Sequence, residues 1–486
     1  MAKKPLNFIL FNPDEMRAES LGCYGHPVAQ TPHIDRLAAE GVRFDQCHVQ
    51  HTVCSPSRCS FMTGWYPHVS GHRTLWHLLR PHEPNLLKYM KRAGYDVAWW
   101  GKNDLLATES FADSVSEVNV RRSEGPTFTK RACNPYSLDD PRYYSFLNDP
   151  PEGPAEAHHD YRSVQGAIDF LGTNPENPFL LYLPISFPHC PFRAPQPWHD
   201  SIDPDTLPPL RPAELANKPD YFQLIRKNRR LDELDQSFLR KINAVYLGMI
   251  GFVDYMLGKL LEALEESGHA DDTVILFFSD HGDWAGDFGL VEKWPSGLDD
   301  CLTRIPMIVR LPKGAKGHVV NEPIECQDLM ATVLELAGVE AEHTHFSRSL
   351  VPQLHGASGD PDRAIFAEGG YDTHEPNASE YWDGRPAFAS KPEAIYYPKI
   401  MQQGENPESV ERAVMIRTMT HKLVRRRQGV CELYELGTDP QELNNRYGDP
   451  ALSAMQSKLE QRLLDWYLQT SDVVPHNDDP RGYAKR

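Results

Sequence analysis

The chain has 486 residues and a formal net charge of -18 at pH 7, with 40% hydrophobic and 24% charged residues. This length exceeds a typical single core and predicts a large domain with a smaller one, and the composition is that of an ordinary soluble globular protein. The strong acidity argues against nucleic acid as a partner, because phosphate binding needs a basic surface. A small anionic substrate stays compatible with it, since a local pocket can be positive on an acidic protein.

The cysteines and the N-terminus bear on location. Nine cysteines at scattered positions form neither a disulfide framework nor a CxxC metal pattern. Residues 1–5 lead directly into a short apolar stretch and have neither the apolar length nor the small-residue cleavage site of a signal peptide. No stretch approaches the length of a membrane span. We expect a reduced, cytoplasmic protein with no membrane partner, although a chain whose leader had been removed would look the same.

Apolar strand candidates alternate with amphipathic helices through the first three quarters of the chain. This pattern predicts an α/β fold with a mostly parallel sheet covered by helices on both faces. The expected strands are 6–11, 97–100, 179–185, 274–278 and 305–309. The expected helices begin at capping or proline signals and end at or near glycines: 31–40, 54–64, 85–92, 161–171, 232–267 and 327–337.

Two regions interrupt this alternation. Residues 107–155 and 190–230 are rich in proline, aspartate, arginine and aromatic residues and have weak periodicity. We expect long excursions near the C-terminal edge of the sheet, where long loops tend to carry function, so they are the expected source of substrate specificity. Surface decoration without function is the alternative.

The composition shifts after residues 368–370. A polar segment through 407 shows little regular structure, and short antiparallel strands are expected at 413–419, 422–427 and 432–436, followed by a helix at 452–468.

A five-residue run, CSPSR, begins at Cys54. Pro56 suits the first turn of a helix, so the pattern places Cys54 near a helix N-terminus, which stabilises nearby anions. Arg58 follows one helical turn later and can face the same site. By itself the run is weak evidence, because Cys54 could equally be a small buried thiol.

Acidic side chains follow two of the predicted strands. Asp14 and Glu15 come after the first strand, and Asp280 and His281 follow the strand 274–278. The C-terminal ends of strands are where open α/β sheets bind ligands, so these side chains would converge if the two strands are neighbours. Carboxylate oxygens suit a hard divalent cation such as Ca²⁺, whereas an imidazole ligand shifts some weight towards Mn²⁺ or Mg²⁺. Turn capping by Asp280 is the alternative.

Taken together, these motifs resemble those of the type I, formylglycine-dependent sulfatases of the alkaline phosphatase superfamily. The resemblance extends to GCYG at 22–25, TPHIDRL at 31–37, GVRF at 41–44, GKNDL at 101–105 and PHCPFRAP at 188–195. It implies that a formylglycine-generating enzyme oxidises Cys54 to an aldehyde, whose hydrate attacks sulfur. It also implies one divalent cation, with Ca²⁺ as first choice and Mn²⁺ or Mg²⁺ as alternatives. The implied ligands are Asp14, Asp280, His281 and formylglycine 54, with Glu15, usually Asp or Gln in the family, as a further candidate.

The resemblance also implies roles around the sulfate group. Arg58 would orient the formylglycine, Lys102 would bind a sulfate oxygen, His189 would protonate the leaving alcohol, and Lys293 would lie near the leaving oxygen. Asp104 occupies a position where the family usually has histidine, so it is a candidate base or a contact for a cationic part of the substrate. Of His72 and His77, which follow the nucleophile helix, His77 is the better candidate for binding substrate.

On this basis residues 1–370 are expected to form the catalytic domain, and residues 371–486 a smaller domain with a four-stranded antiparallel sheet and a helix. The predicted reaction is hydrolysis of a small-molecule sulfate monoester to an alcohol and sulfate. Three alternatives stay open: a phosphonate monoester or phosphodiester hydrolase of the same superfamily, a non-catalytic binder of sulfated ligands, and an ordinary cysteine hydrolase. The sequence leaves open the alcohol, which could be aryl, choline-like or carbohydrate, and the oligomeric state.

Overall fold

The computed structural model describes residues 4–121, 134–372, 374, 391–474 and 481–482. Two sheets are present in these ranges. The strands of the large sheet are β1 (Asn7–Asn12), β2 (Val42–His48), β3 (Asp96–Lys102), β4 (Glu117–Arg121), β5 (Phe179–Pro184), β6 (Thr273–Phe278), β7 (Arg304–Arg310) and β8 (His318–Glu325). Their order is β4-β3-β5-β1-β6-β7-β2-β8, and all neighbours are parallel except that β7 runs antiparallel to β6 and β2. The α/β fold with a mostly parallel sheet is therefore confirmed.

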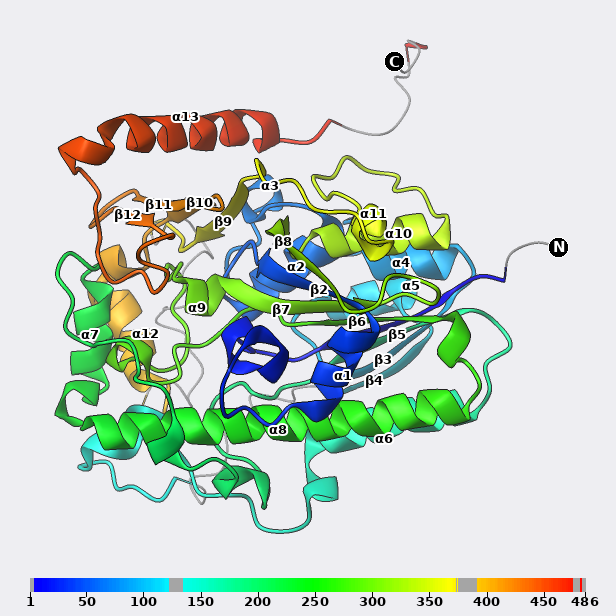
Figure 1. Cartoon of the computed structure of the whole chain (residues 1–486), viewed down its shortest axis with the longest axis horizontal. Helices are drawn as coiled ribbons and strands as arrows, with labels where there is room; N and C mark the ends of the chain where they lie inside the picture. Colours follow the sequence, from blue (N-terminus) through cyan, green and yellow to red (C-terminus); the bar gives the residue numbers. More distant parts are fainter. Residues whose placement is uncertain (1–3, 122–133, 373, 375–390, 475–480, 483–486) are drawn as a thin grey trace.

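Helices cover both faces of this sheet (Figure 1). The helices are α1 (Pro32–Glu40), α2 (Cys54–Thr63), α3 (Pro67–Ser70), α4 (Leu86–Arg92), α5 (Phe111–Ser114), α6 (His159–Gly172), α7 (Tyr221–Asn228), α8 (Gln236–Glu266), α9 (Asp300–Thr303), α10 (Asp328–Ala337), α11 (Val351–Leu354), α12 (Tyr397–Glu405) and α13 (Ser453–Thr470). On one face α8 contacts α1 and α6, and on the other α10 contacts α2 and α4. This three-layer arrangement explains why β1 is apolar throughout, because Ile9 and Phe11 join one buried cluster while Phe8 and Leu10 join the other.

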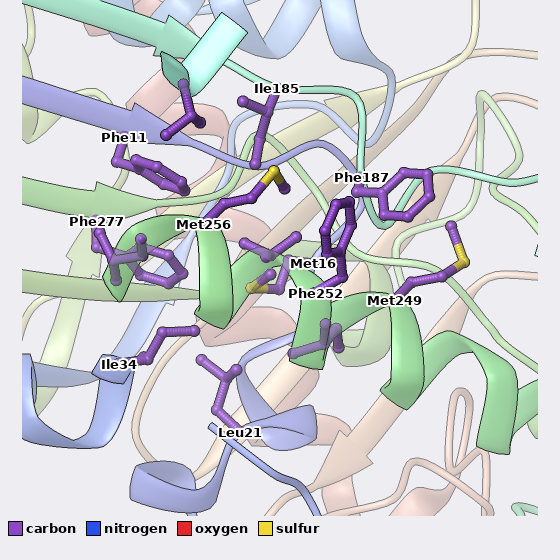
Figure 2. Packing of buried hydrophobic residues seen from close by; sticks show 14 of the residues in the cluster. Phe11, Met16, Leu21, Ile34, Ile185, Phe187, Met249, Phe252, Met256 and Phe277 are labelled. Atoms are coloured by element: carbon purple, nitrogen blue, oxygen red, sulfur yellow. The ribbon is translucent and has the colours of Figure 1, made fainter. Parts of the chain in front are cut away.

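Helix α8 forms the centre of one core layer. Figure 2 shows Met256 of α8 beside Phe11 of β1 and Phe277 of β6, and Phe252 of α8 beside Phe187; all belong to one buried cluster. By length and composition α8 could cross a membrane, which corrects our expectation that no stretch approaches a span, but 89% of its apolar window is buried inside the fold. In this structure α8 packs as a core helix.

The second sheet is smaller and antiparallel throughout. Its strands are β9 (Ile365–Gly369), β10 (Ala413–Arg417), β11 (His421–Arg426) and β12 (Glu432–Glu435), in the order β12-β11-β10-β9. Helix α13 packs against β10 and β11. The expected four-stranded sheet with a C-terminal helix is confirmed, and its first strand lies just before residue 370. The division into two domains at that residue stays a prediction.

Several elements differ from the expectations. Strands β2, β4 and β8 were not predicted, and α12 lies in a segment expected to have little regular structure. The excursion at 107–155 contains α5 and β4, and that at 190–230 contains α7. Edge strand β8 includes Pro323 and charged residues, so it lacks the continuous apolar run that marks the central strands.

Candidate active site

The nucleophile candidate, Cys54, is the first residue of α2 and is buried. Every residue of α2 is buried, and Ser57 Oγ donates a hydrogen bond of 2.6 Å to the Asp280 carbonyl, which fixes the start of the helix against the end of β6. Cys54 Sγ lies 3.4 Å from Asp14 Oδ1 and 3.2 Å from His281 Nε2. Burial and the Asp14 carboxylate raise the pKa of the Cys54 thiol well above its usual value, so the unmodified residue is a protonated thiol.

The predicted metal ligands meet at this sulfur. Strands β1 and β6 are parallel neighbours, so Asp14 and the pair Asp280 and His281 emerge at the same edge of the sheet. One ligand atom from each of Asp14, Cys54, Asp280 and His281 lies within 4.8 Å of the others, and all four residues are buried. His281 Nδ1 lies 2.9 Å from the Gly282 carbonyl, a contact that assigns its proton to Nδ1 and leaves Nε2 as a ligand atom.

Two cations contact the acidic ligands. Arg58 Nε donates to Asp280 Oδ2 at 2.9 Å and Arg58 Nη2 donates to Asp14 Oδ2 at 3.1 Å. Lys102 Nζ donates to Asp14 Oδ2 at 2.5 Å and lies 3.9 Å from Cys54 Sγ. Although burial alone would raise it, the pKa of Asp14 is held well below its ordinary value by the positive charges of Lys102 and Arg58. The Asp14 carboxylate is therefore ionised, as a metal ligand must be.

A second cluster lies beside the first. Lys293 Nζ lies 2.7 Å from His189 Nε2 and forms an ion pair with Glu15, and His189 Nδ1 lies 2.5 Å from the Cys190 carbonyl. These contacts assign the His189 proton to Nδ1, so Nε2 accepts from Lys293. Burial, then Lys293 and Lys102, lower the pKa of His189 well below its ordinary value, which makes Lys293 the resting proton carrier of the pair.

The Glu15 carboxylate lies in the second cluster, and its role as a metal ligand stays a prediction. Glu15 has φ of 66°, and its carboxylate groups with His189 and Cys190, not with the four residues around Cys54. Only its backbone N–H reaches that set, donating to Asp280 Oδ1 at 3.2 Å. Burial raises the pKa of Glu15 to about 8, despite the nearby Lys293. The carboxylate thus serves as the partner of Lys293 in this structure.

The charges of the two clusters fit a divalent cation. Three cations face four carboxylates: Arg58, Lys102 and Lys293 against Asp14, Glu15, Asp104 and Asp280. With Glu15 protonated, as its pKa of about 8 implies near neutral pH, these charges balance, and with Glu15 ionised the side chains carry one net negative charge. In either state a divalent cation among the oxygen and nitrogen donors would make the site positive, so that it attracts an anionic ester. The residues present therefore fit the implied metal.

A family model described as Sulfatase matches residues 7–339. The chain belongs to the sulfatase family. This membership confirms the resemblance predicted from the motifs and places the protein among the sulfuric ester hydrolases. A second model, described as N-sulphoglucosamine sulphohydrolase, C-terminal, matches residues 389–469 of this sulfatase, which include α12, the strands β10 to β12 and most of α13.

Some relatives of this sulfatase are named as sulfatases, and others are named for the alkaline phosphatase superfamily or for phosphonate monoester hydrolysis. The multifunctional alkaline phosphatase superfamily protein PehA of Trinickia caryophylli is 28% identical, with 98% of this chain and 96% of that protein covered. The N-acetylglucosamine-6-O-sulfatase of Bacteroides thetaiotaomicron is 25% identical, with 97% and 88% covered. Among solved structures, the phosphonate monoester hydrolase of Agrobacterium radiobacter has a TM-score of 0.77 at 23% identity, with 96% of each chain covered. At that identity the likeness shows the fold alone.

His72 and His77 lie apart from the two clusters. His72 Nε2 lies 2.8 Å from Glu83 Oε1 and His72 Nδ1 lies 2.6 Å from the His77 carbonyl. Both histidines line a separate cavity of about 240 Å³ that also includes Arg80, His82 and Glu83. Among the described residues, no hydrogen bond joins the His77 ring to Cys54 or its partners, so a substrate contact for His77 stays a prediction.

Three buried charged residues of this sulfatase were missed by the sequence analysis. Glu292, which precedes Lys293, accepts from Arg229 Nη2 at 2.7 Å and from Lys399 Nζ at 2.7 Å. The three side chains are separated by 63 and 107 positions along the chain. The sequence contains no motif that links them, and only the fold brings them together.

Proposed function

We propose that the protein hydrolyses sulfate monoesters of small molecules to an alcohol and sulfate. In this proposal Cys54 is converted to formylglycine by a formylglycine-generating enzyme, and one divalent cation, Ca²⁺ by preference, is held by Asp14, Asp280, His281 and residue 54. The cytoplasmic location and the alternatives Mn²⁺ and Mg²⁺ stay predictions from the sequence.

One observation carries the proposal. Two carboxylates and an imidazole converge on Cys54 Sγ, while Arg58 contacts both carboxylates and Lys102 contacts Asp14. A simple buried cysteine would need neither the acidic ligands nor the paired cations. This arrangement supports a residue 54 that acts together with a cation on an anionic ester.

The formylglycine and the divalent cation would each supply one kind of chemistry. A hydrated aldehyde at residue 54 would supply two hydroxyl groups, one as a nucleophile and one whose deprotonation would allow sulfate to leave, which a serine could not supply. Asp14, Asp280 and His281 would hold the cation, which would supply positive charge to an anionic ester and favour an ionised hydroxyl.

The side chains of this chain do the rest. Lys102, 3.9 Å from Cys54 Sγ, holds a sulfate oxygen next to the nucleophile, and Arg58 keeps Asp14 and Asp280 in place. The pair His189 and Lys293 protonates the departing alcohol, with the proton supplied from Lys293 to His189 Nε2 across 2.7 Å. Asp104 is the candidate that takes the proton from the second hydroxyl.

A phosphonate monoester or phosphodiester hydrolase is the second candidate. The fold shared with the phosphonate monoester hydrolase is compatible with it, and the likeness to a relative named as multifunctional, over nearly the whole of both chains, fits activity on more than one ester. The same charge arrangement suits both esters, so activity on both is expected. The match of residues 389–469 to a sulphohydrolase model favours sulfate as the better substrate.

A non-catalytic binder and an ordinary cysteine hydrolase have less support. The raised pKa of the Cys54 thiol disfavours the thiolate that a cysteine hydrolase needs. A binder would use the cations of the site but would have no need of a modified residue 54.

Two measurements test the proposal. Peptide mass spectrometry after co-expression with a formylglycine-generating enzyme should find the aldehyde at residue 54, and unmodified cysteine alone would favour the binder. The kcat/KM values for matched aryl sulfate and aryl phosphonate esters should favour sulfate. A preference for phosphonate by orders of magnitude would replace the sulfatase assignment with the second candidate.

A further inference from the structure

Lys293 sits in a turn whose neighbouring residue is unusual. Glu292 has φ of 68°, in the left-handed region that a non-glycine residue rarely adopts. Its backbone is held on both sides, because its N–H donates to Asp283 Oδ1 at 3.0 Å and its carbonyl accepts from the Trp284 N–H at 3.1 Å. Such a conformation persists only where the surroundings fix it.

The Glu292 side chain provides a third attachment. Its exposed fraction is 2%, and its two oxygens accept from Arg229 and Lys399, whose exposed fractions are 2% and 10%. The Arg229 guanidinium also lies over the Phe146 ring, 4.5 Å from the centroid. Glu292 therefore joins the loop after α7, through Arg229, to α12, through Lys399.

The same carboxylate competes for Lys293. Glu292 Oε1 lies 4.0 Å from Lys293 Nζ but 2.7 Å from Lys399 Nζ. With both its oxygens bound to Arg229 and Lys399, Glu292 leaves the Lys293 ammonium to His189 and Glu15. If Lys399 were neutral, the half-satisfied carboxylate would draw the Lys293 ammonium away from His189.

Helix α12 is held in place beside α7 (Figure 1). The Tyr143 hydroxyl donates to the Glu393 carbonyl at 2.7 Å, the Tyr144 hydroxyl donates to the Pro392 carbonyl at 2.6 Å, and Asn228 Nδ2 donates to Gln402 Oε1 at 3.0 Å. Lys399 thus reaches Glu292 from a docked segment of the C-terminal part of the chain.

We propose that Glu292 is a positioning residue for Lys293. Bridged by Arg229 and Lys399, it fixes the turn that aims Lys293 at His189, so delivery of a proton to the leaving group depends on α12 being docked. This inference rests on the proposed function, in which His189 and Lys293 protonate the leaving group, and it adds residues outside the motifs of the family.

The test uses Lys399→Met in the full-length, aldehyde-bearing enzyme, with a series of aryl sulfates whose phenols differ in pKa. Methionine keeps the length and burial of the side chain but removes its charge. A good leaving group needs little protonation, so its kcat/KM should change little, whereas the poorest leaving group should lose about 100-fold, within the range of general acid catalysis. Lys293→Met should make kcat/KM fall with leaving-group pKa as steeply as Lys399→Met does. Lys399→Arg should restore the wild-type dependence.

A matched control separates positioning from stability. Lys422 is buried in the small sheet, where it pairs with Glu442 and Asp300. Among the described residues it shares no hydrogen bond or ion pair with Glu292 or Lys293, so Lys422→Met removes a buried cation without touching the proposed relay. It should leave the leaving-group dependence as in wild type. If Lys399→Met fails to fold, Lys399→Gln, which removes the charge but keeps a hydrogen-bond donor for Glu292, should show a steepening in the same direction.

The outcomes are distinguishable. An equal loss for all leaving groups, or no loss in a folded variant, would overturn the positioning role. If the wild type hydrolyses only phosphonate esters, the same series of aryl phosphonates tests the inference. Inactivity of the wild type on both ester classes would overturn the proposed function and the inference that rests on it, whatever the variants do.

Discussion

The Lys102 ammonium lies 2.7 Å from the Asp104 carboxylate and also donates to Asp14. An unpaired carboxylate beside a bound sulfate would repel it. Asp104, at the position where the family usually has histidine, is paired with Lys102, which is proposed to hold a sulfate oxygen. The pairing offsets the repulsion between Asp104 and a bound sulfate, which is compatible with the proposed role of Asp104 as a base.

Replacing Asp104 tests that role. Asp104→Asn keeps the shape but cannot accept a proton, so the first alcohol should be released while sulfate stays on residue 54. We expect a burst of about one alcohol per enzyme followed by turnover reduced about 100-fold or more. Rapid mixing with an aryl sulfate measures the burst, and intact mass spectrometry detects the retained sulfate.

Two comparisons define the result. Asp104→His should recover turnover, because imidazole can take the same proton. A steady-state rate for Asp104→Asn equal to that of wild type, without a burst, would rule out Asp104 as the base and leave a contact with the substrate as its remaining role.

Metal removal should affect both activity and stability. Asp14 and Asp280 are fully buried and face the same point, so a cation bound there stabilises the folded protein by mass action. Chelation should abolish hydrolysis and lower the thermal midpoint, and Ca²⁺ should restore both, with Mn²⁺ and Mg²⁺ compared at equal concentration. Asp280→Asn should weaken the thermal response to Ca²⁺.

The control for metal binding is a buried carboxylate elsewhere. Asp254 caps the start of α1 and belongs to neither cluster, so Asp254→Asn should keep the full response to Ca²⁺. A metal-free wild-type protein with undiminished activity would contradict the metal site.

The fold was largely predictable because burial leaves a periodic signal. The central strands β1, β5 and β6 are buried throughout and read as continuous apolar runs. Strand β2 has no continuous apolar run, and its alternation of apolar and polar residues lasts only from Val42 to Asp45 before the register shifts, which leaves a weak signal. Helix α12 was missed because it is short and polar and owes its place to tertiary contacts such as that of Lys399 with Glu292.

The site residues also divide into those that local motifs predict and those that only the fold brings together. Asp14, Cys54 and Asp280 each follow or begin a regular element, so short motifs place them at one sheet edge. The side-chain direction of Glu15 could not be read, because it depends on a left-handed backbone at that residue and on its pairing with Lys293. Arg229 and Lys399 carry no local signal, since their role exists only where distant segments meet.

Asp254 should give a pH-dependent loss of stability. Its carboxylate accepts from the His33 and Ile34 N–H groups at 2.9 and 2.8 Å, yet burial raises its pKa from 3.8 to about 7. Between these values the folded state holds a proton that the unfolded state has lost, so stability falls as pH rises from about 4 to 7 and is constant above that. Over this pH range the free energy of unfolding should fall by about 4 kcal/mol.

Asp254→Asn isolates this contribution, because the amide oxygen can accept both N–H groups without titrating. The free energy of unfolding of wild type minus that of the variant, measured by denaturant titration at several pH values, should decline from pH 4 to 7. A difference that is constant across this range would show that the carboxylate does not titrate there.

Trp466 should anchor α13 on the small sheet. Its ring stacks on Phe366, with centroids 4.7 Å apart, and meets the Tyr66 ring edge-on at 4.9 Å, and its exposed fraction is 4%. Trp466→Ala should cost about 3–5 kcal/mol and make α13 sensitive to protease under native conditions. On the same helix Leu468 is 70% exposed, so Leu468→Ala should change stability by no more than about 0.5 kcal/mol. Trp466 contacts Tyr66, which follows the C-terminal end of α2, whereas Cys54 lies at the other end of this helix. The Trp466 variant should therefore keep its kcat at low temperature.

Equal protease resistance in Trp466→Ala and Leu468→Ala would mean that other contacts hold α13.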